Sequence, residues 1–103
     1  MSLAMAVITS PNEDAKRLAG GIVERQLGAC VQVVSAAEST FLWQGQIERE
    51  TESLLFVKTK TELAGQLQAY LDEAHPYDVP ELILFPIVAG HSAYLEWMEE
   101  SLA

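Results

Sequence analysis

The chain has 103 residues, half of them apolar, with 15 acidic against 6 basic side chains and a formal net charge of −9. This length and composition are typical of one globular domain, residues 1–103, and exclude a disordered chain. The excess of negative charge disfavours nucleic acids and membranes as partners, because both attract clustered lysine and arginine.

The residues near the start of the chain and the single cysteine indicate the compartment. Cys30 has no partner for an intramolecular disulfide, which favours a reducing environment. The opening MSLAMAVIT lacks a basic flank and reaches Ser10-Pro11 too soon for a signal peptide. No stretch approaches the roughly 20 apolar residues of a membrane span. We therefore expect a soluble, cytoplasmic protein.

The first predicted elements are a strand over residues 3–9 and a helix. Ser10 and Glu13 have the spacing of a capping box, after which apolar residues recur at helical spacing. Gly28 is expected to end this helix in the left-handed conformation. The Gly20-Gly21 pair costs helix propensity and therefore predicts close packing, on a sheet.

A long hairpin is predicted next. Strands over residues 29–34 and 39–43 lead to a turn at Gln44-Gly45-Gln46, and residues 47–59 return.

The last predicted elements are a helix, a strand and a short helix. Thr59 and Glu62 can cap the second helix, and Pro76 ends it. A strand follows over residues 82–88, and Ser92 is expected to cap the final helix.

This order predicts an α+β fold, a ferredoxin-like βαββαβ sandwich with an extra C-terminal helix. Two helices can cover only one face of such a sheet. Yet residues 54–57 and 82–85 are apolar almost without interruption, which indicates burial on both faces. We expect self-association to cover the second face, with Pro86 at the point where strand pairing stops or changes partner.

Several short stretches together resemble the CutA divalent-cation tolerance proteins. They include LGACV at residues 27–31, WQGQI at 43–47 and, most specifically, HPYDVPE at 75–81, followed by YLEW at 94–97. The resemblance implies a ferredoxin-like homotrimer similar to the PII signalling proteins. It implies binding of copper or another divalent cation and a role in metal tolerance, with no organic cofactor and no catalytic reaction.

Three side chains are soft or borderline metal donors: Cys30, His75 and His91. Their spacing matches no local metal motif, so each also has a simpler interpretation. Cys30 can be a small buried apolar residue, His75 a residue at a helix end, and His91 an exposed loop residue. In a trimer one donor becomes three around the axis, and we name Cys30 and His75 as candidate ligands.

Glu48, Glu50 and Glu52 alternate along the predicted return strand and would share one face. They can attract hard cations such as Mg²⁺, or form a solvated face that opposes edge aggregation. Glu52 can instead pair with Lys58 or with an aromatic hydroxyl.

The aromatic residues near the turns suit core or interface packing. The sharper hypothesis is a pocket at a subunit junction that binds a small effector. Its predicted residues are Trp43, Glu52, Lys58, Tyr77, Tyr94 and Trp97.

An enzyme is the third alternative, with Cys30 and His75 as nucleophile and base. Nothing in the sequence positions the pair, and it has neither a glycine-rich phosphate loop nor a serine nucleophile elbow. We therefore expect a binding protein and not an enzyme.

Overall fold

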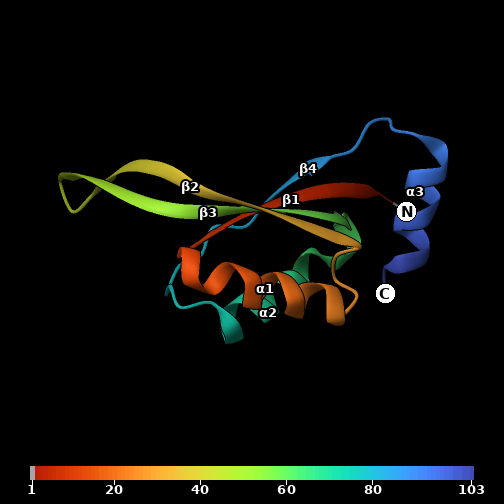
Figure 1. The fold of residues 1–103 in the computed structure, drawn as a ribbon, viewed down its shortest axis with the longest axis horizontal. Coiled ribbons are helices and arrows are strands. Elements are labelled where there is room, and N and C mark those ends of the chain that lie inside the picture. The colour runs from red at the N-terminus through yellow and green to blue at the C-terminus, as the bar shows by residue number, and fades with distance from the viewer. Residues whose placement is uncertain (1) are drawn as a thin grey trace.

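The computed structural model describes residues 2–103 and has four strands and three α-helices (Figure 1). In chain order the elements are β1 (Leu3–Ser10), α1 (Asn12–Glu24), β2 (Cys30–Trp43), β3 (Gln46–Lys60), the 3₁₀ turn Thr61–Leu63, α2 (Ala64–Ala74), β4 (Ile83–Pro86) and α3 (Ser92–Ser101). The predicted order of elements is therefore confirmed.

The strands form one antiparallel sheet in the order β2-β3-β1-β4. Helices α1 and α2 lie side by side against one face of it, and α3 lies beyond one end of the sheet, close to both termini (Figure 1). This is the ferredoxin-like arrangement that the sequence predicts, with the extra C-terminal helix.

The core lies between the sheet and the two helices. Alternate residues of the central strands point into it, among them Ala6 and Ile8 of β1 and Leu55 and Val57 of β3, all fully buried. Helices α1 and α2 cover these strand residues with their apolar stripes. The stripe of α1 includes Leu18 and Ile22, and that of α2 includes Leu67 and Leu71.

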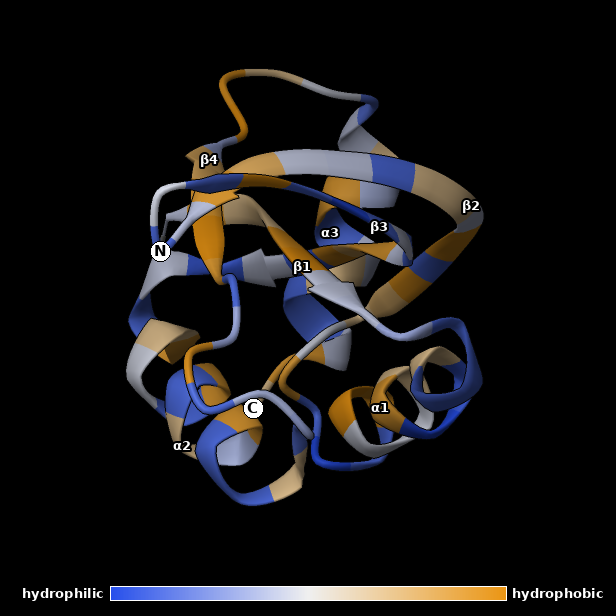
Figure 2. Cartoon of the chain, turned by 90° about the vertical axis from the view of Figure 1, so that its left-hand side faces the viewer, coloured by the Kyte–Doolittle hydropathy of each residue, from blue (hydrophilic) through white to orange (hydrophobic). Residues whose placement is uncertain are grey.

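The opposite face of the sheet is only partly covered within one chain. Ile83 and Phe85 of β4 and Val34 of β2 each keep 49% of their surface exposed. Much of β4 is hydrophobic (Figure 2), and its Ile83 and Phe85 pair with Val7 and Met5, which alternate with the buried Ala4 and Ala6 and so face away from α1 and α2. The expected burial of both faces is therefore not reached within a single chain.

The β2–β3 hairpin forms an arm that extends well beyond the helices (Figure 1). Its turn is at Gln44 and Gly45, where both φ angles are positive, as the sequence predicts from the glycine. The two predicted extended stretches are parts of one strand, since β2 runs from Cys30 to Trp43 through a bulge between Val34 and Ala37. Ala36 lies in this bulge with φ at 63°.

The predicted boundaries of α1 are wrong at both ends. Pro11 precedes the helix without a side-chain cap, and the Ser10 hydroxyl donates instead to the Pro11 carbonyl at 2.9 Å. After the helix it is Gln26, and not Gly28, that adopts a positive φ of 58°. A Cβ at Gly28 would collide with Val57, so this glycine serves close packing on the sheet.

The later caps also differ from the expectation. Thr59 is still in β3, and its buried hydroxyl donates to the Leu27 carbonyl at 2.7 Å, so it forms no capping box with Glu62. His91, and not Ser92, caps α3, since its Nδ1 accepts from the Ala93 N–H at 3.2 Å.

The glycine pair inside α1 has two unequal members. A Cβ on Gly21 would overlap the Tyr70 hydroxyl of α2, whereas a Cβ on Gly20 would meet nothing within 4 Å. The predicted close packing is therefore real, but it is against α2 and not against the sheet.

Candidate functional site

A groove of about 900 Å³ lies where the arm, the end of β1 and the segment after α2 meet. It is lined by Thr9, Ser39, Thr40, Phe41, Trp43, Glu48, Glu50, Glu52, Tyr77, Asp78, Val79 and Glu81. The groove is on the sheet face away from α1 and α2, because Glu52 has the same parity along β3 as the outward-facing Leu54 and Phe56.

The three alternating glutamates lie together on one wall of this groove. Glu48, Glu50 and Glu52 line it from β3, and the β2 residues paired with the first two, Phe41 and Ser39, line it as well. The prediction that these carboxylates share one face is therefore confirmed. Glu52 is at the inner end and keeps only 7% of its surface exposed.

Glu52 has one specific partner. The Tyr77 hydroxyl donates to its Oε2 at 2.8 Å, so the aromatic hydroxyl is the correct alternative and Lys58 is not. Partial burial, and then this hydrogen bond and the charge of Glu52, raise the pKa of Tyr77 far above its usual range. The phenol therefore stays protonated and remains a donor to the carboxylate.

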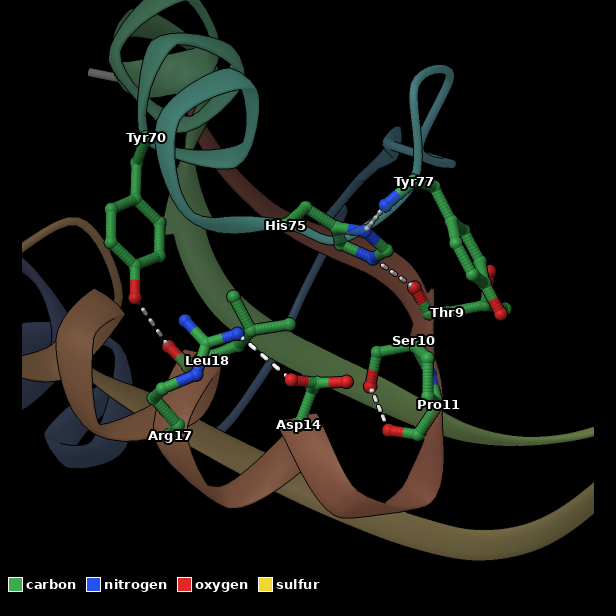
Figure 3. A network of polar contacts seen from close by, with 9 residues as sticks. All are labelled: Thr9, Ser10, Pro11, Asp14, Arg17, Leu18, Tyr70, His75 and Tyr77. Atoms are coloured by element: carbon green, nitrogen blue, oxygen red, sulfur yellow. Dashed lines mark hydrogen bonds and ion pairs between the residues drawn. The ribbon is translucent and has the colours of Figure 1, made fainter.

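His75 connects the segment after α2 to the end of β1 (Figure 3). Its Nε2 lies 2.7 Å from the Thr9 carbonyl, and its Nδ1 accepts from the Tyr77 N–H at 3.1 Å. These partners assign the neutral tautomer with the proton on Nε2. Since both ring nitrogens are occupied and the side chain is 8% exposed, His75 positions Tyr77.

Negative charge dominates the groove. Of the described residues that line it, five are acidic and none is basic. Partial desolvation, and then the charge of Glu52, raise the pKa of Glu81. Within residues 2–103 the one ion pair is between Arg17 and Asp14 on α1, away from this groove.

A second cluster lies on the same sheet face at its opposite end. Cys30 is directly across from Lys58 in the β2–β3 register, and the Lys58 ammonium donates to the Gln32 side chain. Burial, and then the Cys30 thiol, raise the pKa of Tyr94 of α3. Trp97 packs on Tyr94, with ring centroids 5.4 Å apart.

The six residues predicted to form one junction pocket therefore divide between two places in one chain. Trp43, Glu52 and Tyr77 line the groove, whereas the second cluster contains the other three, Lys58, Tyr94 and Trp97.

The two candidate metal ligands are also separated. In the sheet, Cys30 of β2 is opposite Lys58 of β3, and Lys58 is in turn opposite Met5 of β1. His75 instead contacts Thr9, which lies about 13 Å further along β1 than Met5. Over the described part of the chain, no three histidine, cysteine or acidic side chains are grouped so as to hold a metal ion.

Sequence reasoning missed several residues of the groove. Phe41 and Ser39 could have been found, because they alternate with Trp43 along one strand and so share its face. Asp78, Val79 and Glu81 belong to the HPYDVPE stretch, but only the three-dimensional path of that segment brings them to the arm.

Comparison with known proteins identifies the family. A family model described as "CutA1 divalent ion tolerance protein" matches residues 4–101, nearly the whole chain. The chain belongs to the CutA1 divalent ion tolerance family. The resemblance inferred from the short motifs is thereby confirmed.

Individual CutA proteins agree with this assignment. The chain is 43% identical over 95 residues to "Protein CutA 1, chloroplastic" of Oryza sativa, covering 91% of this chain and 54% of that protein. It is 39% identical to "Divalent-cation tolerance protein CutA" of Thermus thermophilus, covering 94% of this chain and 95% of that protein. The crystal structure of CutA1 from Oryza sativa superposes with a TM-score of 0.97 at 39% identity, over 100% of this chain and 95% of the other.

The plant relatives are longer than this chain, which spans about half of their length. The relatives from Oryza sativa and Arabidopsis thaliana are both named as chloroplastic. Across residues 2–103, no helix is long and apolar enough to cross a bilayer.

Proposed function

We propose that this CutA-family protein binds divalent cations, Cu²⁺ among them, as a homotrimer and so contributes to divalent-cation tolerance. The match to the family over residues 4–101 and the name of the Thermus thermophilus relative support the tolerance role. In this proposal the protein acts by binding and does not catalyse a reaction. Its proposed location is the cytoplasm.

The observation that supports a trimer is the sheet face that a single chain leaves half exposed. Near its tip the arm exposes Leu42 by 71%, Trp43 by 58% and Ile47 by 64%. Burying a large apolar side chain stabilises a protein by about 1.5–3 kcal/mol, so a row of such residues favours an assembly that covers them. Trp43 is on the same outward face as Val34, Ile83 and Phe85, whereas Leu42 and Ile47 are paired on the opposite face of the arm.

Metal binding is proposed to involve Cys30 first. Its thiol is a soft donor suited to copper, and the side chain is partly exposed on the uncovered sheet face. A three-fold axis can bring three copies of such a donor together, which a single chain cannot do. His75 remains the second candidate, although a metal would have to displace one of its two backbone hydrogen bonds.

The alternative function is a PII-like trimeric sensor or scaffold that binds a small effector between subunits. The division of Trp43, Glu52 and Tyr77 from Lys58, Tyr94 and Trp97 favours it. The two sets lie at opposite ends of one sheet face, so a neighbouring chain can bring one set to the other.

The first experiment is the solution mass by light scattering, for wild type and for Ile47→Glu. We expect three chains for the wild type and a smaller species for the variant, because a charge in the covered surface opposes association. Glu38→Lys, a charge change at an exposed and already charged position on the same face of the arm, serves as the control. A folded single-copy wild type would contradict the trimer.

The second experiment is calorimetry with Cu²⁺ and Zn²⁺ on wild type, Cys30→Ser and His75→Ala. Submicromolar binding that is lost in the variants supports the metal role. Weak binding that the substitutions leave unchanged supports the effector alternative. Circular dichroism of each variant separates lost binding from lost folding.

A further inference from the structure

Helix α3 buries less of itself than the other two helices. Met98 is the only buried residue of its ten, whereas α1 and α2 each bury three. The helix lies beyond one end of the sheet, close to both termini (Figure 1). Because helices in proteins are held mainly by the packing of an apolar face, the helix itself contributes little to its own attachment.

The two residues that follow α3 make firm contacts with the rest of the chain. Leu102 is 8% exposed and belongs to the same core cluster as Leu27. The Ala103 N–H donates to the Gln26 carbonyl at 3.0 Å, and the Lys60 ammonium donates to the Ala103 carbonyl at 2.6 Å. Leu102 and Ala103 thus form a latch that fastens the end of α3 to the body of the protein.

The segment that receives the latch is itself well fixed. It is the connection between α1 and β2, where the N–H groups of Gln26 and Leu27 donate back to carbonyls of α1. The Leu27 carbonyl accepts from the Thr59 hydroxyl. The Ala29 N–H donates to the Lys58 carbonyl at 2.8 Å, directly before β2 begins. A connection held in this way keeps its position when α3 moves.

The segment that leads into α3 has the opposite character. The Ile87 N–H donates to the Leu3 carbonyl at 3.0 Å, just after β4 ends. Residues 88–91 are all exposed, Val88 by 93%. Among residues 2–103 no hydrogen bond ties this segment to the sheet, α1 or α2. Exposed backbone without such ties moves at little cost, so the segment is suited to act as a hinge.

We infer that α3 is a hinged element that the latch holds closed. When the latch opens, α3 turns about residues 88–91, while the sheet, α1 and α2 keep their structure. Tyr94 and Trp97 move with the helix, so the latch decides whether the second cluster, at the Cys30 end of the sheet, is assembled. This conformational device goes beyond the proposed function, since it operates whichever ligand the protein binds. The competing support for α3 is a neighbouring copy of the chain.

The first test is hydrogen exchange of the assembled protein, measured by mass spectrometry for wild type and Leu102→Ala. We expect the substitution to speed exchange across α3 about tenfold and to leave α1 and α2 within about twofold, because it empties the buried end of the latch. Leu95→Ala is the matched control. It removes the same side chain from α3 at a position that packs on Gly90 and is outside the core cluster, and should change the exchange less than about threefold.

Two further variants leave the core untouched. Ala103→Pro removes the N–H that donates to Gln26, and Leu102 already has the extended backbone, with ψ at 151°, that a following proline favours. Lys60→Met keeps a long side chain and removes the ammonium. Each should speed exchange across α3 about threefold to tenfold, since each removes one hydrogen bond of the latch.

Fluorescence gives a second readout. Trp97 lies in α3 and is the remaining indole in Trp43→Phe. In this background, each latch variant should raise the acrylamide quenching of Trp97 about twofold, because the open helix leaves the indole in water.

Faster exchange confined to α3, together with stronger quenching of Trp97, supports the inference. Three results would overturn it. Equal acceleration across all three helices would make Leu102 an ordinary core residue. An equal effect of Leu95→Ala would remove the special role of the latch. An unchanged α3 in every latch variant would mean that a neighbouring copy of the chain holds the helix.

Discussion

The Tyr77 hydroxyl donates to Glu52 Oε2 at 2.8 Å and so joins the segment after α2 to β3. Glu52 is 7% exposed, and a carboxylate buried to this extent needs a donor to offset its desolvation. The contact also fixes the inner end of the groove, where the arm leaves the body of the protein.

Tyr77→Phe is expected to destabilise the protein by about 1–3 kcal/mol, because it leaves the buried Glu52 carboxylate without its donor. Urea denaturation measures the change. Tyr94→Phe, which removes the hydroxyl of a half-exposed tyrosine, should change the stability by no more than about 0.5 kcal/mol. Equal losses in the two variants would mean that the Glu52 contact has no special role.

Substitution of the two glycines of α1 by alanine is expected to have opposite effects. Gly20→Ala should stabilise the protein by about 0.5–1 kcal/mol, since the added methyl group meets nothing and the helix gains propensity. Gly21→Ala should destabilise it by about 1–3 kcal/mol, because the methyl group displaces the Tyr70 ring, which packs under Arg25 at 4.6 Å.

Thermal unfolding of the two glycine variants checks this prediction. The double variant Gly21→Ala, Tyr70→Phe should recover part of the loss, since the overlapping hydroxyl is gone. A stabilised Gly21→Ala protein would show that α1 and α2 are not held as close as the structure has them.

His75→Leu is expected to cost about 2–5 kcal/mol, because the Thr9 carbonyl and the Tyr77 N–H both lose a partner. His75→Asn should cost about half as much, since an asparagine can still accept from the N–H two residues ahead. His91→Asn is the control. It keeps the same acceptor at the start of α3 and should change the stability little.

Nitrogen NMR of the imidazole gives a second measure of the role of His75. We expect the ring proton on Nε2, which faces the Thr9 carbonyl, and a free lone pair on Nδ1, which faces the Tyr77 N–H. The other tautomer would contradict the hydrogen bond to Thr9.

Glu81→Gln is expected to stabilise the protein at neutral pH. Desolvation, and then the charge of Glu52, raise the folded-state pKa of Glu81 above its ordinary value of 4.5, so the folded state binds this proton more tightly than the unfolded one. Ionisation of Glu81 therefore costs stability as the pH rises through this range. The gain from the substitution should stay below about 1 kcal/mol because the side chain is exposed, and it should vanish below the unfolded-state pKa.

Glu62→Gln provides the opposite sign for the same measurement. Backbone hydrogen bonds, first its own and then that of Ser2, lower the pKa of Glu62. The stability that ionised Glu62 contributes is therefore present above its unfolded-state pKa of 4.5, and it is lost as the pH falls through its folded-state pKa. Urea denaturation of both variants at several pH values should give differences of opposite sign that both shrink in acid.

The fold could be predicted because hydrophobic periodicity and turn residues agree along the chain. The hairpin at Gln44-Gly45 and the order of elements follow from such local signals. Pro76 correctly predicts where α2 ends, but the capping residues could not be predicted, because tertiary contacts override their local preferences. Thr59, for example, donates its hydroxyl to the carbonyl of Leu27, in the segment between α1 and β2.

The candidate site was predicted only in part, for a geometric reason. Trp43, Glu52 and Tyr77 line one groove of the single chain, whereas Lys58 and Trp97 are at the other end of the same sheet face. Resemblance of motifs identifies which residues matter but not whether one chain or two bring them together. The bulge after Val34 could not be predicted either, because no residue type in this stretch indicates it. A bulge bends its strand, so it also affects the direction of the arm.

The short edge strand β4 limits the addition of further strands to the sheet. It ends at Pro86, and the sheet order leaves one side of this four-residue strand unpaired. Pro86 lacks an amide hydrogen, so it cannot donate a backbone hydrogen bond to an incoming strand. This opposes the open-ended addition of strands that builds amyloid-like ribbons. Pro86→Val would supply an amide hydrogen at this edge and is expected to promote the addition of further strands, toward fibres.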